Sequence, residues 1–122
     1  MAKTIFVVDD SASLRQAVGI ALRGAGYEVT EACDGQDALS KLTGQKVHLI
    51  ISDVNMPNMD GITFVKNVKQ MPLYKFTPVI MLTTENQDTK KREGQAAGAK
   101  AWVVKPFQPA QLLGAVEKLV LP

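Results

Sequence analysis

The fold is decided by the stretch VHLIISDVNMPNMDG, which spans residues 47–61. Residues 47–51 are apolar except for His48, and such a run predicts a buried strand. Because the strand is expected to end at Ser52, Asp53 lies at or just past its carboxyl end. A proline and an Asp-Gly pair then indicate a turn. Ligands of open parallel sheets bind beyond the carboxyl ends of strands, so Asp53 is a candidate functional residue. Its alternative role is to cap the next helix.

The rest of the chain repeats this pattern of an apolar strand followed by an amphipathic helix. Strands are predicted at 4–8, 27–32, 47–52, 78–82 and 101–104. The connections are short, which favours an α/β fold: a doubly wound, five-stranded parallel sheet with helices on both faces. The second strand is the most polar and is expected at the sheet edge. The third is the most apolar and is expected in the centre, and His48 is read as a core or edge histidine within it.

Composition limits the class of protein. A chain of 122 residues fits one domain, and we expect a single domain over residues 1–122 with no output domain. The net charge of +2 is too small to indicate nucleic-acid binding. A single cysteine fits a reducing cytosol. No signal peptide and no apolar run of membrane-spanning length is present, so we expect a cytoplasmic protein without a membrane partner.

The helix predicted at 86–98 differs from the others. Between Glu85 and Ala101 the chain has no valine, leucine, isoleucine, phenylalanine or methionine, and Gly94 lies inside the helix. Since large buried side chains supply most of the stability of a packed helix, this one should be among the least stable elements. It is either a weakly packed surface helix or an element that moves.

Polar side chains follow four of the five predicted strands. Asp9 and Asp10 follow the first, Asp53 the third, Thr83 the fourth and Lys105 the fifth. Parallel strands align their carboxyl ends, so these side chains are expected in one crevice. Three carboxylates repel one another unless a cation binds, and Mg²⁺ prefers oxygen ligands. Taken singly, each residue has an ordinary alternative: a helix cap, a strand threonine or a solvated lysine.

These motifs resemble the receiver domains of two-component response regulators, especially the single-domain, CheY-like chemotaxis type. The resemblance covers the whole chain. It rests on the Asp9-Asp10 pair, the DVNMPNMDG stretch around Asp53, the Thr-Thr pair at 83–84 and the Lys-Pro-Phe sequence at 105–107. It implies the strand order 2-1-3-4-5.

The resemblance also implies site roles. Asp53 would accept a phosphoryl group from a histidine kinase. Mg²⁺ would bind Asp10, Asp53 and the backbone carbonyl of Asn55, and Asp9 would support the metal through water. Lys105, which follows strand five, would pair with the phosphoryl group. The resemblance also implies a cis peptide bond between Lys105 and the proline after it. Thr83 would bond a phosphoryl oxygen.

Three further residues are expected to affect switching. Receivers tune the lifetime of the aspartyl phosphate at positions that correspond here to Asn55 and Glu85, and these polar residues predict a short lifetime. Trp102 stands where receivers usually carry a tyrosine or phenylalanine that moves with the threonine. Strand alternation places Trp102 on the opposite face from Lys105. Because its bulk makes inward packing costly, we expect it to be partly exposed in the resting protein.

The resulting interpretation is a phosphorylation-controlled signalling switch that catalyses only its own phosphotransfer and dephosphorylation. The expected partners are a CheA-like histidine kinase and a flagellar motor switch protein. A phosphatase that acts on the phosphorylated protein is a further candidate partner. The chain is expected to be a monomer. A phosphorelay shuttle remains as an alternative. A Mg²⁺-dependent phosphohydrolase fits less well, because such enzymes usually need a second carboxylate where this chain has Asn55.

Overall fold

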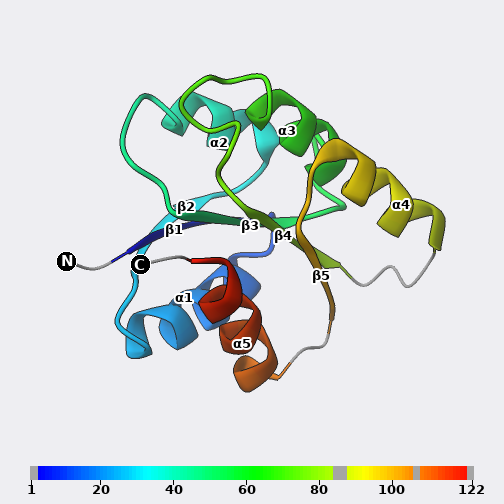
Figure 1. Cartoon of the computed structure of the whole chain (residues 1–122). Coiled ribbons are helices and arrows are strands. Elements are labelled where there is room, and N and C mark those ends of the chain that lie inside the picture. Colours follow the sequence, from blue (N-terminus) through cyan, green and yellow to red (C-terminus); the bar gives the residue numbers. More distant parts are fainter. Residues whose placement is uncertain (1–2, 84–87, 106–107, 121–122) are drawn as a thin grey trace.

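In the computed structural model, residues 3–83, 88–105 and 108–120 are described, without the side chains at positions 83, 88–91 and 94. Strands and helices alternate along this part of the chain (Figure 1). The strands are β1 (Thr4–Val8), β2 (Glu28–Ala32), β3 (Leu49–Asp53), β4 (Val79–Thr83) and β5 (Ala101–Val104). The helices are α1 (Ala12–Gly24), α2 (Gly35–Lys41), α3 (Gly61–Val68), α4 (Asp88–Ala97) and α5 (Pro109–Leu119).

The sheet is parallel throughout, with the order β2-β1-β3-β4-β5. This confirms the predicted fold class, the edge position of β2 and the central position of β3. The order reverses between β1 and β3: the chain moves outward to β2 on one side and to β4 and β5 on the other. Open α/β sheets bind ligands at such a reversal.

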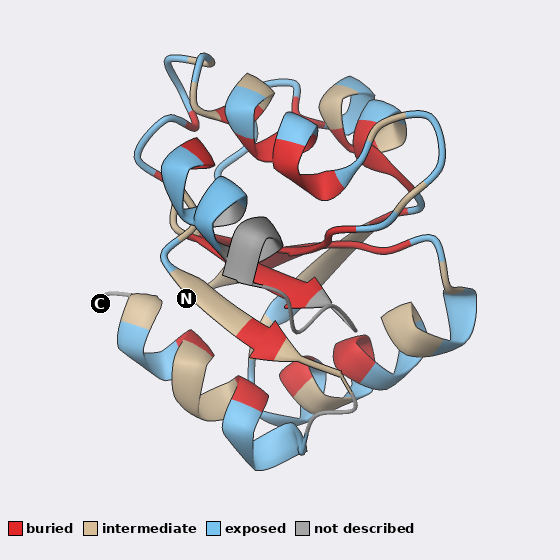
Figure 2. Ribbon diagram, turned by 90° about the vertical axis from the view of Figure 1, so that its right-hand side faces the viewer, coloured by how far each residue is buried: buried red, intermediate tan, exposed pale blue. Residues whose placement is uncertain are grey.

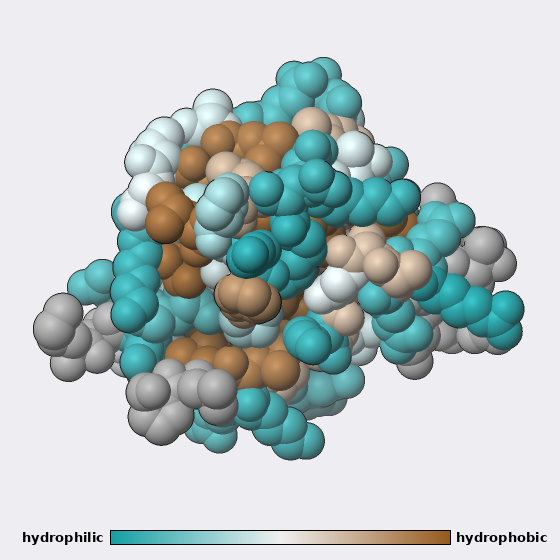
Figure 3. Space-filling model, turned by 45° about the horizontal axis from the view of Figure 1, so that its top comes forward, coloured by the Kyte–Doolittle hydropathy of each residue, from teal (hydrophilic) through white to brown (hydrophobic). Residues whose placement is uncertain are grey.

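Side-chain alternation along the strands creates two cores, one on each face of the sheet. Phe6, Ile50 and Met81 pack with residues of α2, α3 and α4. Ile5 and Ile51 pack with residues of α1 and α5. Figure 1 shows the helices in these two layers, and Figure 2 shows the buried residues between the layers. Figure 3 brings the side with α2 and α3 forward, where apolar atoms show between hydrophilic ones.

Local signals in the sequence account for where several helices begin. Ser11, Asp34 and Asp60 precede α1, α2 and α3, and each side chain accepts a hydrogen bond from a backbone N–H of the first turn. These bonds satisfy amide groups that have no partner within the helix. Helix α5 has Pro109 in its first turn, where proline is well tolerated.

The structure corrects the prediction for His48. Strand β3 begins at Leu49, so His48 lies just before the strand instead of inside it. Its backbone N–H donates to the Thr4 carbonyl oxygen at 2.9 Å, and its Nδ1 accepts from the Thr4 N–H at 3.0 Å. The ring therefore joins the start of β3 to the start of β1.

Helix α4 adds little to the core, as its composition predicts. Among its described side chains, Ala97 is the one that belongs to a core cluster. An alanine removes far less apolar area from water than the isoleucines, leucines and phenylalanines of the other helices. None of the helices in the described part of the chain has the length and apolarity needed to cross a membrane.

Candidate functional site

The register between β1 and β3 brings two aspartates side by side. Val8 is paired with Ser52, and the residue after each is an aspartate, Asp9 and Asp53. Asp53 is the last residue of β3, and Asp9 directly follows β1. Both side chains are buried, with Asp9 2% and Asp53 6% exposed. A buried carboxylate is costly unless it is paired, so these two residues need a cationic partner.

Lys105 supplies that partner from the end of β5. Its Nζ lies 3.2 Å from Asp9 Oδ2 and 3.3 Å from Asp53 Oδ2. The lysine side chain is 15% exposed, so water screens these contacts much less than contacts on an open surface. One ammonium group therefore bridges two buried carboxylates.

The ionisation of Asp53 reflects several opposing effects. Burial raises the pKa of Asp53 above its ordinary value, and the charge of Asp9 raises it further. Lys105 lowers it, as does the Val54 N–H, which donates to Asp53 Oδ1 at 2.8 Å. The balance leaves a raised pKa. The ionised carboxylate is thus held in an environment that would favour a further cation.

Asp9 is held firmly by its neighbours. Its Oδ1 accepts from the Ser11 N–H at 2.8 Å, and its carbonyl oxygen accepts from the Arg15 guanidinium. Arg15 is itself paired with Glu31 at 3.4 Å. Asp9 therefore combines a local hydrogen bond just before α1, whose cap is Ser11, with a contact to Lys105 across the crevice.

Asp10 completes a group of three carboxylates. One oxygen each of Asp9, Asp10 and Asp53 lies within 4.8 Å of the other two, and Asp10 is exposed at the mouth of the group. These hard oxygen donors fit Mg²⁺, which commonly takes one or two carboxylates and keeps several waters. Asn55 lies two residues beyond Asp53 and is also exposed.

The loop after Asp53 depends on a close approach by Gly61. A Cβ atom at Gly61 would lie 1.9 Å from the Asp53 carbonyl oxygen, so a side chain does not fit there. The Gly61 N–H donates to the Val54 carbonyl oxygen at 2.8 Å and closes the loop. Sequence reasoning assigned the Asp-Gly pair only a general role in shaping the turn. The pair was the available signal, but the contact with Asp53 depends on tertiary structure.

A second contact ties this loop to α2. Asn58 has a φ of 67°, in the left-handed region that asparagine tolerates better than most residues. Its side-chain amide donates to Asp34 Oδ2 at 2.9 Å, and Asp34 also caps α2. Sequence reasoning did not identify Asn58, since nothing in the sequence indicates its partner.

The remaining predicted site residues are only partly described. Thr83 ends β4, but its side chain is outside the described part, as are Glu85 and the proline of the predicted cis bond. Trp102 is half-buried, pairs with Met81 in the sheet register and packs on the core cluster beside α2 and α3. Its functional role stays a prediction, as do the roles of the other site residues.

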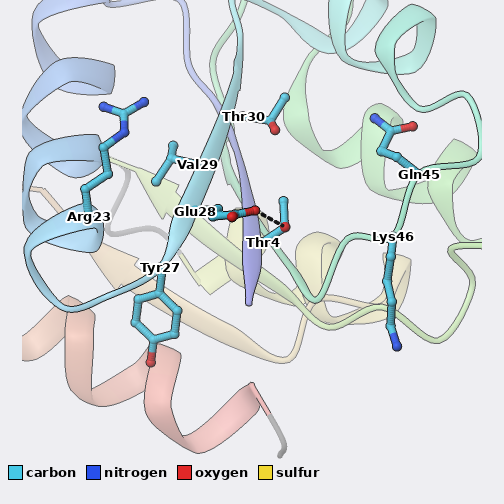
Figure 4. Close-up of a pocket in the computed structure, with 8 residues that line it drawn as sticks. All are labelled: Thr4, Arg23, Tyr27, Glu28, Val29, Thr30, Gln45 and Lys46. Carbon is cyan, nitrogen blue, oxygen red and sulfur yellow. Dashed lines mark hydrogen bonds between the residues drawn. The ribbon is translucent and has the colours of Figure 1, made fainter. Parts of the chain in front are cut away.

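A hollow of about 590 Å³ lies at the opposite end of the sheet, near the start of β1 and β2. Figure 4 shows its lining side chains, with Arg23 and Lys46 on opposite sides and a hydrogen bond between Thr4 and Glu28. These side chains do not converge on one point. The hollow therefore lacks the convergent polar groups typical of a ligand site.

Comparison with known proteins agrees with the geometry. Residues 5–117 match the model of the response regulator receiver domain. The structure of the chemotaxis protein CheY4 of Vibrio cholerae superposes with a TM-score of 0.93 at 50% identity, covering 98% of this chain and 99% of that chain.

Two curated relatives come from Pseudomonas aeruginosa. Protein PilG is 34% identical over 93% of this chain and 84% of its own length. The phosphate regulon regulator PhoB is 35% identical over 97% of this chain and 52% of its own length. The chain thus spans about half of PhoB.

Fold, acidic crevice and comparisons define a signalling protein of the two-component class. The chain belongs to the response regulator receiver domain family. Its structure is CheY-like over almost the whole chain.

Proposed function

We propose that this chain is a chemotaxis response regulator, switched by phosphorylation of Asp53 by a CheA-like histidine kinase. The observation that supports the proposal most is the Lys105 ammonium between Asp9 and Asp53, with a third carboxylate within 4.8 Å. Buried charges in a crevice at a strand-order reversal are expensive to maintain. A site for transferring a charged group accounts for them.

In the proposed reaction, a carboxylate oxygen of Asp53 attacks the phosphorus of a phosphohistidine. The new O–P bond forms as the N–P bond breaks, and the imidazole leaves. Phosphoryl transfer depends mainly on positioning and on charge stabilisation. Lys105, 3.3 Å from Asp53 Oδ2, would pair with the oxygens of the transferred group. Thr83 at the end of β4 would donate a hydrogen bond to one of them.

Asp10, Asp53 and the backbone carbonyl of Asn55 would hold Mg²⁺. The metal ion would neutralise negative charge on the phosphoryl oxygens. Asp9 would keep its contact with Lys105 and support the metal through water. Asn55 and Glu85 would set the rate at which water removes the phosphoryl group.

The phosphoryl group adds about −1.5 to −2 charges at the end of β3. We infer that the response reaches the surface formed by α4, β5 and α5, which would then bind a flagellar motor switch protein. Two observations support this surface. Helix α4 contributes little to the core, so moving it costs little. A hollow of about 430 Å³, lined by Trp102, Gln111 and Gly114 among others, lies between β5 and α5.

The experiment is a gene deletion scored for swimming bias, with complementation. The wild-type gene should restore normal reversals, and the Asp53→Asn gene should not. Gly24→Ala is the matched control, because its added methyl group meets nothing within 4 Å, and it should restore reversals. Normal swimming in the deletion strain would refute motor control. Transfer of the phosphoryl group from Asp53 to a second histidine protein would then favour a phosphorelay shuttle.

A further inference from the structure

Two large apolar side chains are exposed on one loop at the end of the sheet away from Asp53. Leu73 is 72% exposed and Phe76 is 87% exposed. Both belong to the segment between α3 and β4. We call the surface formed by residues 43–48 and 70–78 the Phe76 surface. Clustered exposed apolar side chains on a soluble protein commonly mark a binding site.

The exposure of Leu73 and Phe76 is not caused by a loosely held loop. Tyr74 between them is 2% exposed; its hydroxyl donates to the Gln45 carbonyl oxygen and accepts from the Gly44 N–H, both at 2.9 Å. On the backbone, the Tyr74 and Lys75 N–H groups donate to the Met71 carbonyl oxygen at 3.0 and 2.9 Å, and the Thr77 N–H donates to that of Tyr74 at 2.9 Å. The loop is thus anchored while it presents its apolar side chains outward.

Hollows lie on both sides of this anchor. One, of about 380 Å³, is lined by residues including His48, Phe76 and Pro78. The other, of about 300 Å³, is lined by residues including Leu42 and Met71. Leu73 and Tyr74 line both. Their sizes are in the lower range of pockets that accept small molecules or single side chains of a partner.

The charge of the Phe76 surface has one sign. The chain has no aspartate or glutamate at 38–52 or at 61–84, the segments from which this surface is built. Lys46 and Lys75 are exposed, and neither is paired with an acidic side chain of the described residues. Lys75 lies 5.0 Å from the centre of the Phe76 ring, so positive charge directly borders the apolar group.

His48 also indicates that positive charge dominates the Phe76 surface. Burial lowers its pKa, and the positive charges of Lys3 and Lys46 lower it further. Because Nδ1 accepts from the Thr4 N–H, the ring proton is on Nε2, which makes the ring a hydrogen-bond donor beside the first hollow. The charged side chains of the Phe76 surface are thus all basic and the His48 ring adds a donor, a combination that complements carboxylates.

We propose that the Phe76 surface docks an acidic segment of a partner protein whose large apolar side chains enter the two hollows. Leu73 and Phe76 are the apolar anchors, and Lys46 and Lys75 form a basic rim that attracts the acidic residues. Anchored apolar residues surrounded by polar ones are typical of the centre of protein interfaces. The surface lies at the amino ends of β3 and β4, opposite Asp53, so this docking leaves the phosphorylation crevice open.

The test is selection from a displayed library of random peptides on the immobilised wild-type protein. Enriched peptides should carry aspartate or glutamate next to leucine, phenylalanine or tryptophan. A synthetic copy of one such peptide should shift NMR signals of residues 43–48 and 70–78. Its affinity should fall about tenfold or more in Phe76→Ser and in the Lys46→Glu, Lys75→Glu double variant. Added salt should also weaken it.

Two controls separate this proposal from general stickiness and from the phosphorylation site. Ile20 on α1 is another exposed large apolar residue, at 69%, so Ile20→Ser should leave peptide binding unchanged. Asp53→Asn should also leave it unchanged. Thermal unfolding of Phe76→Ser should match the wild type, since the ring is mostly outside the fold.

Several results would overturn the proposal. Peptides that lack acidic residues, or that bind Phe76→Ser as well as the wild type, would refute it. Phe76-dependent binding to phosphatidylglycerol vesicles without any peptide binding would make this a membrane surface. Self-association of the wild type that is lost in Phe76→Ser, again without peptide binding, would make it an interface between copies of the chain.

Discussion

The substitution Gly61→Ala tests how the Asp53 loop is built. The added Cβ would lie 1.9 Å from the Asp53 carbonyl oxygen, whereas such contacts are essentially never shorter than 3.0 Å. The backbone must therefore separate by about an ångström at the first residue of α3. Overpacking of this kind typically costs ~1–3 kcal/mol. The hydrogen bond from the Gly61 N–H to the Val54 carbonyl oxygen contributes roughly another 0.5–1.5 kcal/mol to stability. The same movement would weaken or break this bond.

Reduced freedom of the unfolded chain offsets about 0.4–1 kcal/mol of that cost. We expect Gly61→Ala to lower the free energy of unfolding by about 2–3 kcal/mol. Urea denaturation followed by circular dichroism measures this. Because the displaced atom belongs to Asp53, the rate of phosphorylation by acetyl phosphate with Mg²⁺ should fall as well.

The matched control is Gly24→Ala at the end of α1, where the added methyl group meets nothing within 4 Å. It should keep or raise stability by up to ~1 kcal/mol and should react normally. A Gly61→Ala variant whose free energy of unfolding lies within about 0.5 kcal/mol of the wild type, and which is phosphorylated at the wild-type rate, would show that the loop does not need glycine at this position.

The crevice, the start of β3 and the surface of β5 can each be tested separately. Asp10→Asn should raise the melting temperature without metal, because it removes one of three crowded carboxylates, and should weaken Mg²⁺ binding in a titration; a lower melting temperature would contradict the crowding. The lowered pKa of His48 means that the unfolded chain binds more protons below about pH 6.5, so stability should fall as the pH drops through that range. His48→Gln should reduce this dependence, and an unchanged pH profile would exclude His48 as its source. Beryllofluoride with Mg²⁺ should change Trp102 fluorescence and reduce its quenching by iodide, whereas unchanged signals in a loaded sample would exclude Trp102 from the switch.

The sequence was sufficient to predict the sheet and the position of Asp53. Residues 49–53 are almost entirely apolar up to the aspartate, and this pattern depends only on burial. The sequence also predicted that Asp9 and Asp53 lie close together, because parallel strands align their carboxyl ends. The strands and the positions of these two aspartates can be predicted because hydrophobic periodicity and strand ends are visible in the local sequence.

Other features depend on contacts between distant segments. The need for glycine at position 61 comes from the path of the Asp53 backbone, and the ring of His48 accepts its hydrogen bond from Thr4 on another strand. The exposure of Phe76 could not be predicted either, because an apolar residue near a strand is usually buried. In each case the tertiary partner, not the local pattern, decides the outcome.

Intact-protein mass spectrometry measures whether Asp53 accepts the phosphoryl group. Incubation with acetyl phosphate and Mg²⁺ should add one phosphoryl group to the wild type, and peptide mapping after borohydride reduction should place it on Asp53. Asp53→Asn should gain none, while Gly24→Ala should be labelled like the wild type. Equal labelling of Asp53→Asn would contradict the assignment.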